Sequence, residues 1–474
     1  MSDLPDPAPN ISRRDLLRRA ATVGLLAVPA VGFLDACATG GGSSNTNTGG
    51  GAKSAKNPLG VKEDASLEVV IFNGGYTDKY AVQVHEPLYK KEFPKASIKH
   101  EAETEIGKVL QPRFNAGNPP DMVNNSGAGA MDFGALVAAN QLLDLTPMWD
   151  APSVDDANKK VRDTVVPGTV EVGSFNGKPY VLYYVSTVFG IWYNGKLFQD
   201  KGWTAPSDWN GFLKLLDSIK AGGITPYAYA GANAAYYQWN VILTHAAKLG
   251  GEEVLKNIDN LEDNAWKNES VVKAATMWAE VGAKYMPKAF EGLRHTDVQL
   301  QQNQDKVAFY PSGDWLPNEQ KDNTPAGFKY QMMPIPDKGK LSEKAVRATA
   351  GEGYVVPSKA KNAQGGMEYL RQMLSRDGAR GFAELIKSPP VTVGASDGVD
   401  FGPGVTSSQA ALKAAGKEVV NVFFDGWYQE IDKEARTATN ALMFGRIKPD
   451  AWADQIQKKA DAVKKDSSVT KFKR

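Results

Sequence analysis

Residues 180–193 read YVLYYVSTVFGIWY, an extended run rich in aromatic and β-branched residues. Such residues favour β-strands because their side chains pack well on a pleated surface. The run is much longer than a common strand of about five or six residues. It therefore predicts a strand that leaves one lobe of the protein and enters a second one.

The chain before this run alternates the signals of strands, loops and helices. Residues 67–72 are apolar and β-branched, and they end at a glycine-rich loop. The next elements expected are, in order, helix 78–93, strand 96–100, helix 106–117, strand 121–123 and loop 124–127. This alternation predicts a parallel sheet with helices on both faces, whose ligands lie beyond the carboxyl ends of the strands. The loop residues Asn73, Gly75, Asn125 and Ser126 are therefore candidate ligand-binding residues.

The chain after the run continues with helices and a few strands. A helix is expected to begin at residues 206–209 and to end at the glycine pair 222–223. The other elements expected are helices 239–249 and 271–285, strands 306–310 and 353–356, a helix over 366–386, and a largely helical region after residue 407. The whole pattern predicts an α/β protein without internal repeats.

Composition excludes several classes of site and partner. The chain has 474 residues and a formal net charge of +1, so no whole-molecule field would attract nucleic acid. With one cysteine, a disulfide within the chain is impossible, and so is a metal site built on several thiolates. The four histidines are widely spaced, and no phosphate-binding or dinucleotide-binding glycine motif is present. We expect neither a cofactor nor a bound metal.

The signals for an enzyme are weak. Residues 394–398 (GASDG) match the Gly-x-Ser-x-Gly pattern, but a nucleophile elbow needs a helix directly after Ser396, and residues 399–404 are typical of a loop. The last histidine is His295, whereas hydrolases of that fold place theirs after the serine. A glycosidase needs two carboxylates across a cleft, and the sequence does not locate such a pair. We therefore expect no catalytic residues and no enzyme, with a secreted glycosidase kept as an alternative.

Sugar recognition needs aromatic and polar residues side by side. The apolar face of a pyranose ring stacks on tryptophan or tyrosine, and its hydroxyls need carboxylates, amides and backbone groups. Trp315 and Trp427 each lie beside a glycine and near a carboxylate, and Tyr183 and Tyr237 are further candidates. Five other tryptophans fall on expected helices or strands, where packing in the core is the simpler interpretation: Trp149, Trp192, Trp266, Trp278 and Trp452.

The first 65 residues are expected to export and tether the protein. Residues 12–18 (SRRDLLR) followed by the apolar stretch 20–34 are typical of a twin-arginine signal. Residues 34–37 (LDAC) resemble a bacterial lipobox, which makes Cys37 the expected lipid attachment site and 1–37 the signal. Residues 38–65 begin with a glycine- and serine-rich stretch that predicts a flexible tether. The alternative is an ordinary exported protein with an incidental cysteine.

Several stretches resemble the extracellular solute-binding proteins of carbohydrate ABC transporters, the family that includes maltose-binding protein. Those stretches are 175–180 (FNGKPY) with 191–194 (IWYN), 307–315 (VAFYPSGDW), 351–357 (GEGYVVP) and 441–452 (ALMFGRIKPDAW). A narrower resemblance is to the actinobacterial N-acetylglucosamine- and diacetylchitobiose-binding lipoproteins. It rests on 13–19 (RRDLLRR), 60–65 (GVKEDA), 110–115 (LQPRFN), 118–121 (NPPD), 258–262 (IDNLE) and 264–267 (NAWK).

The resemblance implies a two-lobed periplasmic-binding-protein-like fold of type II. Lobe 1 would comprise residues 66–185 with 353–400, and lobe 2 residues 186–352 with 401–474, joined by crossings near 184–190, 350–354 and 403. A sugar would bind between the lobes, against Trp315, Trp427 and Tyr237, with Asp314 and Glu352 among the groups that hold its hydroxyls.

The implied function is capture of N-acetylglucosamine or chitooligosaccharides for an ABC importer, at the outer face of the cell membrane. The expected partners are the sugar and the membrane permease subunits with a cytoplasmic ATPase behind them, and the protein itself is expected to be a monomer. Two alternatives stay open beside the glycosidase: a binding protein for another oligosaccharide, and a sensor or adhesion lipoprotein of the same fold.

Overall fold

A computed structural model describes residues 51–127, 129–166 and 168–474 of the chain. The expected export signal and lipid attachment at Cys37 lie outside the described residues. The strands are β1 (Leu67–Phe72), β2 (Ile98–Glu103), β3 (Met122–Asn124), β4 (Ser174–Phe175), β5 (Lys178–Pro179), β6 (Leu182–Asn194), β7 (Thr225–Tyr227), β8 (Val307–Gly313), β9 (Tyr330–Met333), β10 (Val346–Val355) and β11 (Val419–Val420).

The α-helices are α1 (Glu86–Glu92), α2 (Ile106–Asn115), α3 (Phe133–Ala138), α4 (Thr146–Trp149), α5 (Thr169–Val172), α6 (Gly195–Lys201), α7 (Trp209–Ala221), α8 (Ala235–Gly250), α9 (Glu253–Asp259), α10 (Glu269–Tyr285), α11 (His295–Asn303), α12 (Leu316–Glu319), α13 (Ala363–Met373), α14 (Arg376–Ile386), α15 (Gly402–Ala415), α16 (Phe424–Trp427), α17 (Gln429–Met443) and α18 (Pro449–Lys465). Short 3₁₀ or π turns connect some of them.

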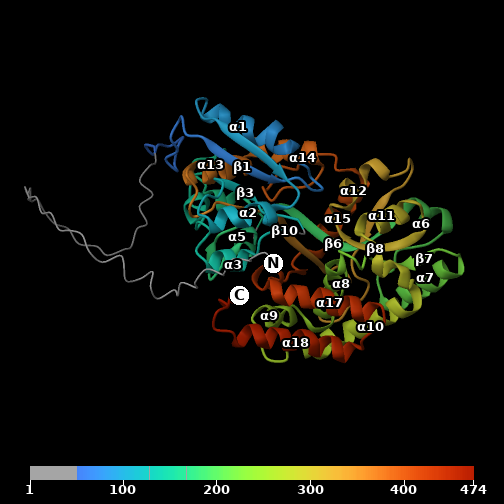
Figure 1. Cartoon of the computed structure of the whole chain (residues 1–474). Helices are drawn as coiled ribbons and strands as arrows, with labels where there is room; N and C mark the ends of the chain where they lie inside the picture. The colour runs from blue at the N-terminus through green and yellow to red at the C-terminus, as the bar shows by residue number, and fades with distance from the viewer. Residues whose placement is uncertain (1–50, 128, 167) are drawn as a thin grey trace, which may run out of the picture. The chain divides into compact units, whose positions relative to one another are not determined.

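The strand expected from the run 180–193 is present as β6, and its length has a structural reason. Its first half pairs antiparallel with β10, from Leu182 opposite Tyr354 to Phe189 opposite Arg347. Its second half pairs with β8 and β9 instead. The sheet order is β2-β1-β3-β10-β6-β8-β7, so β6 and β10 lie between two groups of strands (Figure 1). One long strand thus links both groups.

The parallel sheet predicted for the first part of the chain is confirmed for β2, β1 and β3, which all run parallel. Alternate residues of β1 belong to different apolar clusters: Val69 and Ile71 to one, and Val70 to the other. The cluster of Val70 includes Leu110 of α2, and the cluster of Val69 includes Leu370 of α13. Helices therefore cover both faces of this sheet, as the strand periodicity of two requires.

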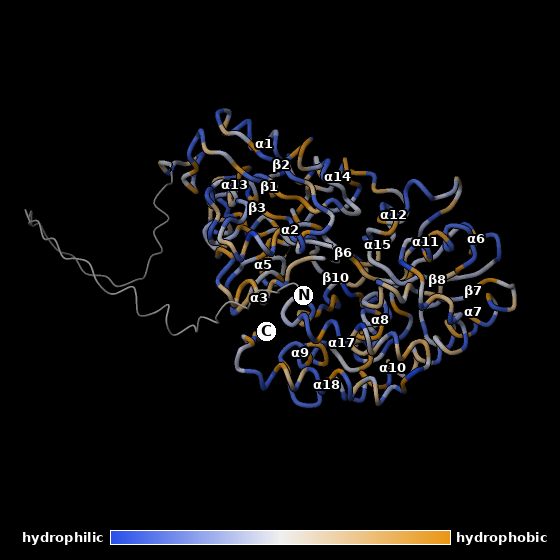
Figure 2. The backbone as a smooth tube through the Cα atoms, viewed as in Figure 1, coloured by the Kyte–Doolittle hydropathy of each residue, from blue (hydrophilic) through white to orange (hydrophobic). Residues whose placement is uncertain are grey.

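The core is rich in aromatic residues. The five tryptophans interpreted as packing residues are all buried, with at most 1% of their surface exposed: Trp149, Trp192, Trp266, Trp278 and Trp452. Figure 2 shows hydrophobic stretches along strands of the sheet and many hydrophilic ones in the outer loops. Within the described residues, no helix combines the length and the apolar character needed to cross a membrane.

The structure corrects two of the expected helices. The helix expected over 366–386 is two helices, α13 and α14, because Ser375 breaks the chain between them and caps α14 by accepting a hydrogen bond from Gly378 N–H. The helix expected over 78–93 begins with a π-helical turn at Ala81–His85 and continues as α1, whose second residue is Pro87. Proline has no N–H to donate, so the first turn of a helix tolerates it.

Candidate functional site

A cavity of about 400 Å³ lies beside the two long strands. Residues from four stretches that lie far apart in the sequence form its wall: 127–133, 172–183, 347–350 and 422–436. Tyr183 of β6 and Arg347 of β10 both line it. Because β6 and β10 pair along this stretch, the sheet itself determines the distance between these two side chains.

Part of the cavity lining is aromatic. Tyr183 packs edge-on against Phe133, with 5.9 Å between ring centroids, and Trp427 packs against Phe423 at 5.3 Å. Trp427 belongs to the short helix α16 and is 5% exposed. A Cβ built on Gly426 would lie 3.7 Å from the Tyr183 hydroxyl, in ordinary van der Waals contact. The structure thus brings two predicted sugar-binding residues, Tyr183 and Trp427, to the same cavity.

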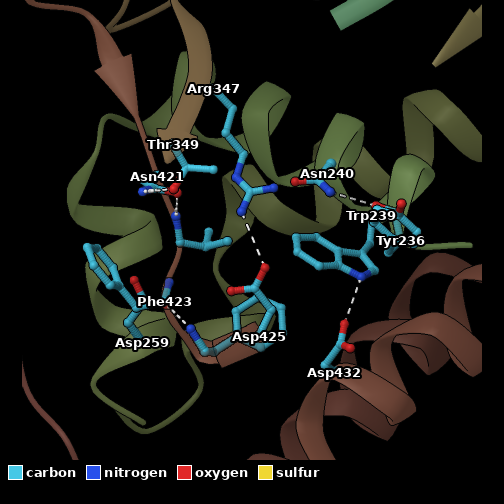
Figure 3. A network of polar contacts seen from close by, with 12 residues as sticks. Tyr236, Trp239, Asn240, Asp259, Arg347, Thr349, Asn421, Phe423, Asp425 and Asp432 are labelled. Carbon is cyan, nitrogen blue, oxygen red and sulfur yellow. Dashed lines mark hydrogen bonds and ion pairs between the residues drawn. The ribbon is translucent and has the colours of Figure 1, made fainter. Parts of the chain in front are cut away.

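Charged residues also line the cavity, and Figure 3 shows Arg347, Asp425 and Asp432 with their polar contacts. The Arg347 guanidinium is 4% exposed and donates to Asp425 at 3.3 Å. It lies over the ring of Phe189 at 4.5 Å, and the ring of Trp239 is 5.4 Å away. Burial lowers the pKa of Arg347, although the Asp425 carboxylate opposes this change. A guanidinium this deeply buried needs acceptors to offset the loss of water.

A second ion pair, between Asp432 and Arg436, also lines the cavity. Asp432 of α17 accepts a hydrogen bond from Trp239 Nε1 at 3.1 Å and another from Arg436 Nε at 2.8 Å. Burial raises the pKa of Asp432 to about 6. Arg436 in turn lies over the ring of Tyr236 at 4.6 Å. Both oxygens of Asp432 therefore already have protein partners.

Trp315 and Tyr237 are connected to Arg347 through Phe189. Trp315 Nε1 donates to the Tyr237 hydroxyl at 3.3 Å, and the Trp315 ring packs against Phe189 at 5.5 Å. Phe189 is the same ring on which Arg347 lies. Trp315 is half-buried, and Tyr237 is buried beside Tyr236. These contacts connect the predicted pair Trp315 and Tyr237 with the cavity, although neither residue forms its wall.

The two predicted carboxylates, Asp314 and Glu352, act electrostatically on the same tyrosine. Each contributes to raising the pKa of the buried Tyr76, after burial itself. Asp314 is 2% exposed, and burial raises its pKa to about 7. Glu352 accepts from Asn124 Nδ2 at 3.4 Å, and burial raises its pKa as well. Its φ of 56° is in the left-handed region, where residues other than glycine are uncommon.

The predicted loop residues have different surroundings. The Asn125 amide bonds both the carbonyl and the N–H of Met131, so its polar atoms already hold the loop. Ser126 Oγ accepts from Gly353 N–H at 3.0 Å and from Asn124 Nδ2 at 2.9 Å. Asn73 and Gly75 are exposed. The structure brings Ser126 into the surroundings of Glu352, and the backbone N–H of Asn125 also donates to the Gly353 carbonyl at 2.7 Å.

Six charged residues of the cavity were not among the predicted binding residues: Asp132, Arg347, Asp425, Asp432, Lys433 and Arg436. A signal existed for Arg347, which is a charged residue inside the otherwise uncharged stretch 345–351 of a strand. Asp425 is the carboxylate near Trp427, a tryptophan that the sequence had already indicated as a candidate for sugar binding. Nothing in the local sequence of α17 distinguishes Asp432 and Arg436 from an ordinary exposed helical ion pair.

The described residues contain no cluster of three or more His, Cys, Asp or Glu side chains that could hold a metal ion. Ser396, the serine of the Gly-x-Ser-x-Gly match, lies in a turn, and the next helix, α15, begins only at Gly402. The geometry of a nucleophile elbow is therefore not present there.

Comparison with known proteins identifies relatives for nearly the whole chain. The family model described as bacterial extracellular solute-binding protein matches residues 73–380. The diacetylchitobiose binding protein NgcE of Streptomyces coelicolor is 33% identical over 477 residues, which cover 98% of this chain and 99% of that protein.

Two solved structures illustrate the similarity of fold. RafE of Streptococcus pneumoniae in its apo form has a TM-score of 0.65 at 21% identity, and the match covers 85% of this chain and 99% of RafE. A chitin oligosaccharide binding protein has a TM-score of 0.66 at 16% identity, covering 83% of this chain and 98% of that protein. At such identities the likeness shows the fold alone, and it confirms the predicted α/β fold of periplasmic binding proteins.

Proposed function

The chain belongs to the bacterial extracellular solute-binding proteins, and on this premise we propose that it captures chitobiose, other chitooligosaccharides or N-acetylglucosamine for an ABC-type sugar importer. Support for the ligand comes from the relative that is named for diacetylchitobiose and aligns along almost the entire chain. Members of this family bind solutes, and the proposal accordingly includes no catalytic step.

The observation that carries the proposal is the cavity, whose lining combines aromatic with charged side chains. Tyr183 and Trp427 supply flat apolar surfaces, and Arg347 and Asp425 supply a donor and an acceptor. Sugar recognition needs this combination, because the C–H face of a pyranose is apolar while its rim is polar. We place one sugar ring in this cavity.

A second ring is proposed to extend toward Trp315 and Tyr237. Trp315 is half-buried, so part of its ring remains available for stacking. Asp314, Glu352 and Ser126 would hold hydroxyls of the sugar in this proposal. We leave Asn125 out of the proposed contacts, because its amide is already engaged by Met131.

The proposed partners follow from the role of the family. The sugar-loaded protein would dock on permease subunits in the membrane, with an ATPase on the cytoplasmic side, and would act as a monomer. Export by the twin-arginine signal and anchoring through Cys37 remain proposals that concern residues outside the structure. The proposed lobes are those expected from the sequence, with β6 and β10 as the crossings.

Calorimetric titration of the mature protein with N-acetylglucosamine, chitobiose, maltose and xylobiose tests this function. We expect stoichiometric binding of the acetylated sugars without product formation. Binding of maltose or xylobiose alone would keep the sugar-binding role and contradict the proposed ligand. Release of monosaccharide from chitobiose would contradict the role itself, in favour of a glycosidase.

A further inference from the structure

Two buried hydrogen-bond donors of the cavity wall have no acceptor among the described residues. They are Arg347 Nε and Trp427 Nε1. Buried polar groups in folded proteins are almost always hydrogen-bonded, so an unpartnered one needs an explanation. Both residues line the same cavity, so a ligand bound there would lie beside these unpartnered groups.

The Arg347 guanidinium is held in place, but most of its N–H donors have no hydrogen-bond acceptor among the described residues. It carries five N–H donors, and the hydrogen bond to Asp425 is the one that the described residues provide. At 3.3 Å this bond is long for a pair of opposite charges, which usually approach to about 2.7–2.9 Å. The rings of Phe189 and Trp239 restrict the guanidinium to its position, so its remaining donors are oriented before any ligand arrives.

We infer that Arg347 and Asp425 recognise the acetamido group of an N-acetylated sugar. The guanidinium donates to the acetamido carbonyl oxygen, and the Asp425 carboxylate accepts from the acetamido N–H. The acetyl methyl group then packs against the aromatic part of the wall, at Phe423 and Trp427. This inference rests on the sugar-binding function proposed above and assigns the residues that select its ligand.

The chemistry of the pair favours an acetamido group over its two closest substitutes. A hydroxyl carries its donor and acceptor on a single oxygen and brings no methyl group, so the apolar wall stays uncovered. An ammonium group can donate to Asp425, but its positive charge is repelled by Arg347. An acetamido group alone among the three offers an acceptor, a donor and an apolar end.

The neighbouring ion pair provides a matched comparison within the same cavity. Arg436 and Asp432 are also a guanidinium and a carboxylate, but Asp432 already accepts from Trp239 and from Arg436 at 2.8 Å. Asp432 has no oxygen left without a protein donor. Removing the Arg436 charge therefore changes the field of the cavity without removing the proposed acetamido contact.

The test compares three disaccharides. Chitobiose carries acetamido groups, and cellobiose carries hydroxyls in their place. The third disaccharide is the glucosamine dimer, which is the deacetylated form of chitobiose. Calorimetry would measure the affinity of the wild type, Arg347→Met, Asp425→Asn and Arg436→Met for each. We expect the first two variants to lose about 10- to 150-fold in affinity for chitobiose, the range of a lost hydrogen bond to a charged group, and much less for cellobiose. Arg436→Met should change both affinities by a similar factor.

Equal losses for chitobiose and cellobiose, or no loss, would overturn the assignment. A wild type that prefers cellobiose or the deacetylated dimer overturns the acetamido inference but leaves sugar capture standing, whereas binding of no sugar overturns both. Thermal unfolding checks that each variant folds. If Arg347→Met does not fold, Arg347→Lys replaces it in the test. Lysine keeps the positive charge but lacks the planar guanidinium, so this variant should still lose selectivity for chitobiose.

Discussion

At the scale of single residues, Trp315 shows how a glycine positions an aromatic ring. A Cβ on Gly313 would lie 2.0 Å from the Trp315 ring, so any side chain at 313 would displace the indole. The ring is also held by Tyr237 through its N–H and by Phe189 through edge-on packing. A ring held in this way loses little freedom on binding, which favours affinity.

Trp315→Ala is expected to weaken binding of chitobiose by about 1–3 kcal/mol, because a stacked aromatic contact and its buried area are lost. Calorimetry measures the change. Trp203→Ala is the control, since Trp203 is also half-buried and packs on Phe198, on a segment that does not line the cavity. Equal affinities for wild type and Trp315→Ala would remove Trp315 from the proposed site.

Asp314 makes the stability of the protein depend on pH. Burial raises its pKa to about 7, whereas an unfolded aspartate has a pKa of about 3.9. Between these values the folded state keeps a proton that the unfolded state has lost, so stability falls as pH rises. The contribution of Asp314 is fully present below pH ~4 and is lost as pH rises through about 7.

Asp314→Asn should therefore flatten the decline of unfolding free energy between pH 5 and 7. Part of the decline should remain, because burial also raises the pKa of Asp259 to about 7 and that of Asp432 to about 6. Urea unfolding of both proteins at several pH values provides the measurement. Two parallel curves would show that Asp314 ionises normally in the folded protein.

At the scale of elements, the strands were easier to predict than the breaks between helices. β1 has the bounds expected from its β-branched run, and β6 occupies nearly the whole of 180–193. The division of 366–386 into α13 and α14 was missed, because a single serine cap decides it and the apolar periodicity continues on both sides. β10 begins several residues before the expected 353–356, where pairing with β6 extends it.

Residues 472–474 act as a strap on the segment that carries Trp427. Phe472 packs on Trp427 at 5.7 Å and exchanges hydrogen bonds with Tyr428. Arg474 pairs with the buried Asp259 at 2.8 Å, and Asp259 accepts from the N–H groups of Phe423 and Phe424. The strap thus supports one wall of the cavity from behind.

Arg474→Ala is expected to lower the free energy of unfolding by about 2–3 kcal/mol and to weaken sugar binding, because Asp259 loses its partner and the cavity wall loosens. Chemical unfolding and calorimetry measure the two effects. Lys473→Ala is the control: its pair with Glu262 is exposed and should contribute no more than about 1 kcal/mol. The same affinity for both variants would contradict a role of the strap in binding.

At the scale of the whole molecule, β6 and β10 connect two groups of strands and two apolar clusters. Tyr184 and Tyr354 belong to the cluster of Val69, and Val188 and Val346 belong to the cluster of Val70, which also contains residues of α8 and α10. A ligand that contacts side chains from both parts should therefore stabilise both. Hinge closure around the ligand is the usual motion of such proteins.

Chitobiose at 100 times its dissociation constant should raise the free energy of unfolding by about 2.7 kcal/mol. Hydrogen exchange should show slower exchange in both β1 and α8, since the proposed ligand would link the two parts. Slower exchange in one of them alone would place the sugar on one lobe and contradict the proposed site between the lobes.

The sequence by itself determined the class of fold, the long connecting strand, the buried tryptophans and the family. These properties depend on local periodicity and on motifs of a few neighbouring residues. The order of residues along the chain therefore contains them directly. The tertiary structure decided the composition of the cavity. Arg347, Asp425 and Asp432 lie on three separate elements, and pairing and packing alone bring them within reach of one another. It also decided that Asn125 holds a loop, because hydrogen bonds to Met131 depend on how that loop folds.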